Sequence, residues 1–279
     1  MKVYISVDME GASGITHVAQ TSPAGKDYEM GKELLLGDVN AAIEGAFRGG
    51  ATEVYINDAH HTMRNIDIRH IDSRGQLLSG KLTPLTMMEG LDSSFDTTFL
   101  VAYHSMVGSN TGVLNHTFFP GSVIQELKIN GFRVGESAMN GFFSHNVGVP
   151  VTLVTGDSAA VHEAKEMLNP CQTVSVKEGV GKYGAWCKSP AKTSNHIRNA
   201  AEAAVHCVAG ISCYPMLEAP YTWTVTFGSS TMADLATLVP QVTRISGRVV
   251  EFKDYAYNDC YRLFTAISMI GSLGVDHPE

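Results

Sequence analysis

The sequence lacks several features that would assign it to a common class of protein. Its five cysteines are an odd number and include no Cys-x-x-Cys pair, so neither a disulfide framework nor a thiolate zinc site is predicted. Buried, reduced thiols are the simplest interpretation of these residues, which are Cys171, Cys187, Cys207, Cys213 and Cys260. No apolar run approaches the roughly 18–20 residues of a membrane span, and the first residues lack the apolar core of a signal peptide. We therefore expect a cytoplasmic protein that does not bind membranes.

Basic residues are also scarce. The chain has 20 lysines and arginines against 28 aspartates and glutamates, a net charge of −8, and the basic residues form no cluster. This balance argues against a nucleic-acid-binding protein. The 279 residues are 44% hydrophobic and 17% charged, which permits one large or two modest globular domains with a sizeable core.

The order of apolar patterns predicts an α/β fold. A β-branched strand ends at Val7, a helical pattern runs over about 28–48, and a second strand covers 52–58. This βαβ unit implies parallel strands. Buried strands are also predicted over 97–103 and 149–157. We expect a mostly parallel sheet with flanking helices.

A Gly-rich stretch of mixed pattern before Pro190 suggests a domain boundary. We expect residues 1–190 to form an α/β metal-binding catalytic domain and residues 191–279 a smaller α+β domain. In the second part, alternation predicts a strand over 221–227, and a last helix is expected over 257–272. Its predicted strands do not end in the acids and histidines found earlier in the chain.

Two acids follow the first strand. Asp8 and Glu10 are two residues apart, so on an extended chain their carboxylates point to the same side. Like charges held together are costly unless a cation lies between them, which favours a metal ion. Solvated acids, or a shifted pKa, would relieve the repulsion equally well.

Two later strands also end in candidate ligands. The second strand is followed by Asp58, His60 and His61, and the strand over 97–103 is followed by His104. Parallel strands bring their carboxyl ends to one edge of the sheet, where ligands bind in open α/β folds. At most one of the two adjacent histidines can face the acids. A lone histidine such as His60 is more often a hydrogen-bonded structural residue. The prediction of a metal site therefore depends on several strand ends meeting at one edge of the sheet.

Mixed histidine and carboxylate ligands suit zinc, manganese or iron better than calcium, and they do not select among these ions. Two histidines and three carboxylates exceed the needs of a closed four-ligand site. They fit two metals about 3.5–4 Å apart bridged by a carboxylate, as in two-metal hydrolases. Asp8 is the candidate bridge.

Together these residues resemble the bacterial D-aminopeptidase family, which comprises dinuclear zinc metallopeptidases associated with dipeptide-transport operons. The resemblance covers essentially the whole chain and is densest over the first 160 or so residues. The motifs that carry it are Ser6-Val7-Asp8-Met9-Glu10-Gly11, Asn57-Asp58-Ala59-His60, Met88-Glu89-Gly90-Leu91-Asp92, Tyr103-His104, Asn115-His116, Val134-Gly135-Glu136 with Asn140, Gly156-Asp157 and Lys188-Ser189-Pro190-Ala191.

The resemblance implies two zinc ions per chain, with Asp8 bridging them and His116 as the catalytic general base or acid. The implied zinc ligands are Asp8, Glu10, His60, His104 and Glu136. From the residues alone, Glu136 is typical of an acid at a helix N-terminus, and His116 of a structural histidine on a strand over 113–119.

The implied activity is removal of an N-terminal D-amino acid, such as D-alanine, from short peptides by a metal-bridging hydroxide. Family members have an α/β domain, a smaller α+β domain and a homodecamer of stacked rings. The chain departs from the family in the loop from Gly14 to Asp27, through Thr16-His17 and Thr21-Ser22-Pro23. Loops beside a metal site control substrate access, so this difference bears on specificity.

Three alternatives remain at this stage. The first is another metal-dependent amide hydrolase with an L-peptide or non-peptide substrate. The second is a non-catalytic dipeptide-binding protein, against which the missing signal peptide and the full set of metal ligands argue. The third is a phosphoesterase, which would need a basic residue beside the metals, and none of the strand ends supplies one.

Overall fold

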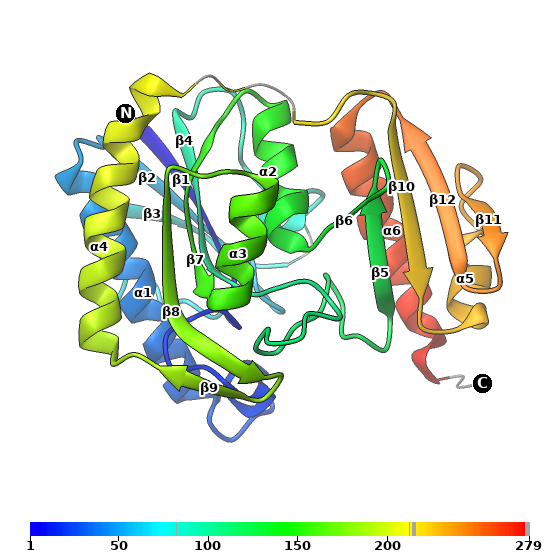
Figure 1. Cartoon of the computed structure of the whole chain (residues 1–279), viewed down its shortest axis with the longest axis horizontal. Coiled ribbons are helices and arrows are strands. Elements are labelled where there is room, and N and C mark those ends of the chain that lie inside the picture. The colour runs from blue at the N-terminus through cyan, green and yellow to red at the C-terminus, as the bar shows by residue number, and fades with distance from the viewer. Residues whose placement is uncertain (82, 212, 214–215, 277–279) are drawn as a thin grey trace.

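The larger part of the molecule is a seven-stranded sheet flanked by helices (Figure 1). The computed structural model describes residues 1–81, 83–211, 213 and 216–276. The strand order is β3-β2-β1-β4-β7-β8-β9, and every neighbouring pair is parallel except β8 and β9. The strands are β1 (Lys2–Val7), β2 (Glu53–Asp58), β3 (Gly75–Leu78), β4 (Thr97–Tyr103), β7 (Val151–Asp157), β8 (Gln172–Gly181) and β9 (Gly184–Cys187). The predicted mostly parallel α/β fold is confirmed.

The central strands are buried on both faces, as their apolar runs require. All seven residues of β4 and of β7 are buried. In β1 the side chains of Val3 and Ile5 enter one core, whereas Tyr4 enters the other, because successive strand side chains point to opposite faces. This central position fixes the carboxyl end of β1, where Asp8 and Glu10 lie, in the middle of the sheet edge.

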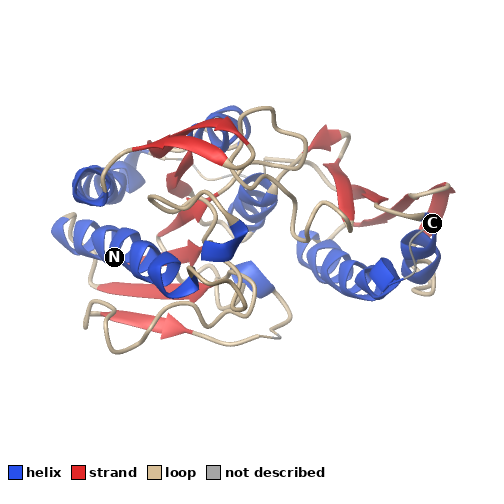
Figure 2. Ribbon diagram, turned by 90° about the horizontal axis from the view of Figure 1, so that it is seen from below, coloured by secondary structure: helices blue, strands red, loops and turns tan. Residues whose placement is uncertain are grey.

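Helices cover both faces of this sheet (Figure 2). One face packs against α1 (Tyr28–Arg48) and α4 (Pro190–Cys207), and the other against α2 (Glu136–Asn146) and α3 (Ser158–Met167). The predicted helix over 28–48 is therefore present. No helix in the described part of the chain is both long and apolar enough to cross a membrane. Single 3₁₀ turns complete the helical elements: η1 (Val18–Gln20), η2 (Thr86–Met88), η3 (Val208–Gly210) and η4 (Leu273–Asp276).

A second, antiparallel sheet has the order β11-β12-β10-β5-β6 and packs against α5 (Ser230–Ala236) and α6 (Tyr257–Ser272) (Figure 1). Its strands are β5 (Ile124–Ile129), β6 (Phe132–Arg133), β10 (Tyr221–Phe227), β11 (Thr243–Ser246) and β12 (Val249–Asp254). The β5–β6 turn has Asn130 at φ 50° and Gly131 at φ 85°, the left-handed pair that an Asn-Gly hairpin uses. The strand over 221–227 and the helix over 257–272 match the expectation from the sequence.

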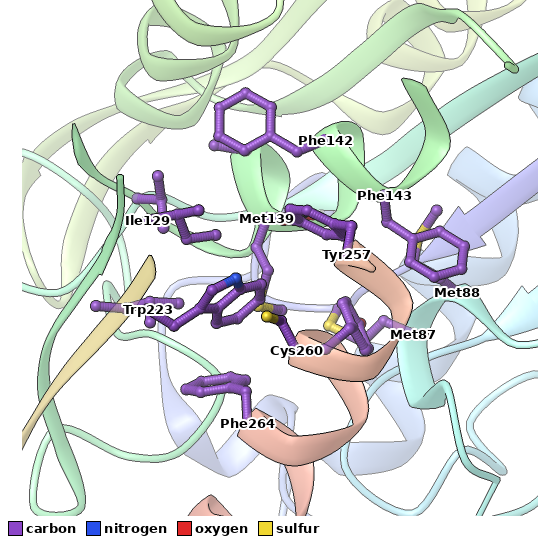
Figure 3. Close-up of a cluster of buried hydrophobic side chains, with 14 of the residues drawn as sticks. Met87, Met88, Ile129, Met139, Phe142, Phe143, Trp223, Tyr257, Cys260 and Phe264 are labelled. Carbon is purple, nitrogen blue, oxygen red and sulfur yellow. The ribbon is translucent and has the colours of Figure 1, made fainter. Parts of the chain in front are cut away.

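One apolar core joins the two sheets. Trp223 of β10 is fully buried, and its ring lies 5.4 Å from the rings of both Tyr257 and Phe264 on α6. Figure 3 shows Met139 and Phe143 of α2 in the same cluster. The hydroxyl of Tyr257 donates to the carbonyl of Met139 at 2.8 Å, which ties α6 to the helix that begins at the candidate ligand Glu136.

Sheet membership does not follow the division expected near residue 190. Strands β5 and β6 come from the first 190 residues but pair with β10, and α4 begins at Pro190 but packs against α1. The division into residues 1–190 and 191–279 stays a prediction about independent folding, which the arrangement of the sheets does not test.

The cysteines differ from the expectation of buried, reduced thiols. Cys171 and Cys207 form a disulfide with Cα atoms 6.5 Å apart, so the expectation is wrong for this pair. Packing of α4 beside β8 brings the two residues together, and their separation of 36 residues gave no indication of it. Of the unpaired cysteines, Cys260 is buried, Cys213 is half-buried and Cys187 is exposed.

Candidate metal centre

Asp8 and Glu10 follow β1 at the edge of the sheet, and both are buried. The backbone of Asp8 still belongs to the sheet, because its N–H donates to the carbonyl of Val101 at 3.0 Å. The two carboxylates do lie on the same side. Nδ1 of His60, from the end of β2, is 3.4 Å from Oδ1 of Asp8 and 3.0 Å from Oε2 of Glu10.

His104 follows β4 and contacts the other oxygen of Asp8. Its Nε2 lies 3.3 Å from Oδ2 of Asp8 and 3.3 Å from Oε1 of Glu136. Nδ1 of His104 donates to the carbonyl of Ser105 at 2.9 Å, which leaves Nε2 unprotonated and facing the acids in the neutral ring. Asp8 therefore lies between two sets of groups, with one carboxylate oxygen facing each.

Glu136 is the first residue of α2 and is 4% exposed. It reaches the centre because the preceding Gly135 packs closely, where a Cβ would lie 2.9 Å from Cβ of Met106. The backbone N–H of Phe118 donates to Oε1 of Glu136 at 2.5 Å. The position at a helix N-terminus agrees with the interpretation from the residues, but only the family resemblance connected this acid with the metal centre.

His116 lies in the long connection between β4 and β5, and the strand expected over 113–119 is wrong. Leu114 and Phe118 have positive φ values of 52° and 61°, which break the extended chain on both sides of the histidine. The ring of His116 stacks on that of His104 with centroids 4.0 Å apart. Its Nδ1 donates to the carbonyl of Leu114 at 2.9 Å, and its Nε2 lies 3.8 Å from Oε1 of Glu136.

Two strand-end residues do not join this group. The Asp58 carboxylate instead accepts hydrogen bonds from the backbone N–H groups of Asn65 and Ile66, at 2.5 and 2.9 Å. The side-chain amide of Asn65 in turn donates to the carbonyl of His60 at 2.7 Å, so Asp58 supports the loop that carries His60. Of the two adjacent histidines, His60 contacts the acids, and His61 has a left-handed backbone with φ 49°.

The electrostatics of the group fit a bound cation. Burial and the charge of Glu10 raise the pKa of Asp8 to about 7. Burial also acts to raise the pKa of Glu10, but the neighbouring His60 outweighs it and holds that pKa well below its usual range. Oδ2 of Asp8, Oε2 of Glu10 and Nε2 of His104 are buried and have no hydrogen-bond partner among the residues that the structure describes. Buried polar atoms normally have partners, and a metal ion would serve all three.

Ligand atoms fall into two overlapping sets. Those of Asp8, Glu10 and His104 lie within 4.8 Å of one another, and those of His104, His116 and Glu136 do likewise. His60 belongs beside the first set, given its contacts with Asp8 and Glu10. The residues present therefore suit two neighbouring cations, of the kind that histidine and carboxylate ligands bind.

The centre opens into a cavity of about 500 Å³. Leu114, Phe118 and Phe119 give one part of it an apolar wall. Thr21 and Ser22, in the loop between Gly14 and Asp27, also line it, and the carbonyl of Thr21 accepts from Nε2 of His60 at 2.9 Å. This loop therefore contacts the space that a substrate would occupy. A cavity of this size accommodates a small organic molecule.

Comparison with known proteins gives one consistent result. The sequence model of a family described as D-aminopeptidase matches residues 1–266. A D-aminopeptidase of Bacillus subtilis (strain 168) is 35% identical over 192 residues, which is 69% of each protein. The structure is similar to that of the Zn-dependent D-aminopeptidase DppA from Bacillus subtilis, described as a self-compartmentalizing protease, with a TM-score of 0.93 and 28% identity over 98% of both chains.

Proposed function

Because the chain belongs to the D-aminopeptidase family, we propose that it is a zinc aminopeptidase that removes N-terminal D-amino acids, such as D-alanine, from short peptides. The observation that carries this proposal is the position of the Asp8 carboxylate, whose Oδ1 lies 3.4 Å from Nδ1 of His60 and whose Oδ2 lies 3.3 Å from Nε2 of His104. A bridging carboxylate between two ligand sets is the arrangement of two-metal hydrolases.

We propose Asp8 as a ligand to both of two zinc ions, Glu10 and His60 as ligands to one, and His104 and Glu136 as ligands to the other. Their mutual contacts support this division. When bound, two ions supply a hydroxide nucleophile at neutral pH and polarise the scissile carbonyl.

His116 acts as the general base and then the general acid in the proposed reaction. Its Nδ1–H is held by the carbonyl of Leu114, so the lone pair of Nε2 faces the centre. Burial and the adjacent His104 hold the pKa of His116 below its usual range, which favours the neutral ring that can accept a proton. The same Nε2 can then donate that proton to the leaving amine.

The assembly and compartment are part of the proposal. We propose a homo-oligomer, a decamer of stacked rings, that acts in the cytoplasm. The similarity to a self-compartmentalizing protease supports an assembly. Exposed apolar side chains on and beside the β8–β9 hairpin also support it, because Val180, Tyr183 and Trp186 are 69%, 62% and 77% exposed in the single chain.

A panel of alanyl dipeptides tests the stereochemistry. We expect the kcat/KM for D-Ala-L-Ala to exceed that for L-Ala-L-Ala by about 100-fold or more. In a site shaped for a D-residue, an L-residue shifts the scissile bond away from the catalytic groups, and a shift of about 1 Å can cost a factor of that size. Each assay is repeated after chelation and after zinc is restored. Equal or inverted rates would favour an L-peptidase, and binding without hydrolysis of either peptide would favour a dipeptide-binding protein.

A further inference from the structure

The cavity that carries the acids of the metal centre also carries two lysines. Lys81 and Lys182 line it, and both side chains are exposed. Within the described part of the chain, neither ammonium has a carboxylate within 4.0 Å. Because the acids that line this cavity, Asp8, Glu10 and Glu136, are proposed zinc ligands, the two lysines are the charged groups left to pair with an anionic part of a substrate.

Each lysine is tied to a segment of the centre through its backbone. The carbonyl of Lys182, in the turn between β8 and β9, accepts from the N–H of Leu114, whose own carbonyl holds His116. Lys81 follows Gly80, whose N–H donates to the carbonyl of Met63 at 2.6 Å in the loop that begins with His60. The backbones of both lysines are therefore held beside segments of the centre.

We propose that Lys81 and Lys182 form a binding subsite for the free C-terminal carboxylate of a short peptide, an inference that rests on the proposed function. A dipeptide whose scissile bond lies at the proposed zinc centre has its C-terminal carboxylate only a few bonds away. The apolar wall formed by Leu114, Phe118 and Phe119 lies in this cavity and can contact the intervening side chain. The subsite would restrict the enzyme to peptides that end soon after the scissile bond.

The test compares D-Ala-D-Ala with its C-terminal amide, which differs only in the charge of that end. For the wild-type protein we expect the ratio of kcat/KM, acid over amide, to be about fivefold, as for partly exposed ion pairs. In Lys182→Met, and more fully in Lys81→Met/Lys182→Met, the ratio should fall toward one. Lys192→Met is the matched control, an exposed lysine of α4 that is not among the cavity-lining residues, and should retain the wild-type ratio.

The outcomes separate this proposal from the proposed function. If the wild-type protein hydrolyses acid and amide equally, or if the double variant keeps the preference, the subsite is wrong while the peptidase stands. If neither compound is hydrolysed, the proposed function fails. If p-nitrophenyl phosphate is hydrolysed faster than the peptide, and only when both lysines are present, the cations serve a phosphoesterase and the subsite is overturned.

A different observation concerns Lys177 of β8, which is fully buried. Its Nζ donates to the carbonyls of Glu10, Ala12 and Ile15 at 2.6, 2.7 and 2.6 Å, so all three ammonium hydrogens are used. The Asp38 carboxylate also holds this segment, through the N–H and hydroxyl of Ser13, both at 2.8 Å. We infer that Lys177 is a positioning residue that fixes Glu10 for metal binding.

Zinc affinity tests this role without reference to turnover. We expect Lys177→Met to bind zinc about 10–100-fold more weakly than the wild type in a chelator competition, the usual cost of losing a group that orients a ligand. Lys188→Met is the matched control, because the Lys188 ammonium also donates to a backbone carbonyl, that of Ser175, but not in this segment.

Two further measurements distinguish a positioning role from a general loss of folding. The unfolding midpoint of each metal-free variant shows whether the protein is folded, and Lys177→Gln, which keeps a donor group, should have an intermediate zinc affinity. A folded Lys177→Met variant with wild-type zinc affinity would overturn the positioning role. Absence of zinc binding in the wild-type protein would instead overturn the proposed function.

Discussion

Replacing His116 with alanine will leave zinc bound but will lower kcat for a D-alanyl dipeptide by about 10²–10⁴-fold, the usual contribution of a positioned general acid–base group. The reason is geometric. Nε2 of His116 lies 3.8 Å from Oε1 of Glu136, close enough to count among the possible ligand atoms, but we propose it as a proton carrier, so its loss removes none of the five proposed ligands. The measurement is steady-state hydrolysis together with the metal content of the same preparation.

His61→Ala is the matched control for this variant. His61 lines the same cavity, and its ring lies 5.9 Å from that of His60, but it is not among the groups that contact the acids. We expect this variant to keep hydrolysis within a few-fold of the wild type. Near-wild-type activity in His116→Ala with zinc bound would refute the catalytic role of His116.

Replacing Asp8 with asparagine will abolish hydrolysis because the proposed two-metal centre will lose the carboxylate that we assign to both ions. Each oxygen of Asp8 faces a different histidine, and an amide of the same shape would present an NH₂ group to one of them. We expect no more than one zinc per chain, measured by elemental analysis after gel filtration. We also expect zinc to raise the unfolding temperature of this variant less than that of the wild type, because stabilisation by a ligand follows its affinity.

Without metal, the Asp8→Asn substitution should not lower the unfolding temperature. Burial and Glu10 raise the pKa of Asp8, so removing this carboxyl relieves repulsion among buried acids. The metal-free Asp8→Asn variant should therefore unfold at or above the wild-type temperature. Asp157→Asn is the control, a buried acid at the end of β7 whose capping of α3 an asparagine can preserve. Wild-type zinc content in Asp8→Asn would contradict the bridging role.

The part of the site that was predictable from sequence follows from parallel strands. Asp8, Glu10, His60 and His104 come directly after strands that the sequence marks as buried, and a parallel sheet brings such ends to one edge. Asp58 satisfies the same rule but turns to the backbone of Asn65 and Ile66. Position at a strand end therefore predicts proximity to the site, and the local turn decides which side chain enters it.

Glu136 and His116 lay beyond such reasoning. They come from a helix N-terminus and from a connection without regular structure, and they join the centre through contacts with residues distant in sequence. Alternating polarity around His116 predicted a strand, but left-handed residues at Leu114 and Phe118 fold that segment against Glu136. Alternation of polar and apolar residues shows that successive side chains have different surroundings. Here a compact loop produces that pattern without pairing of strands.

The second sheet illustrates a related limit. The strand over 221–227 was recognisable from its local alternating pattern. Pairing of β5 with β10, which are separated by about a third of the chain, depends on the shared core around Trp223 and had no local signal. Local patterns therefore identified most elements, whereas long-range packing determined which elements belong to one sheet.

A zinc titration of metal-free protein distinguishes a two-metal centre from a one-metal centre. Zinc is added in known equivalents per chain, and hydrolysis of D-Ala-D-Ala is measured at each step. We expect activity to be absent without metal and to reach its maximum at about two equivalents, as a two-metal site requires. Full activity at one equivalent, or hydrolysis by protein shown to be free of metal, would contradict the proposed dinuclear centre formed around Asp8.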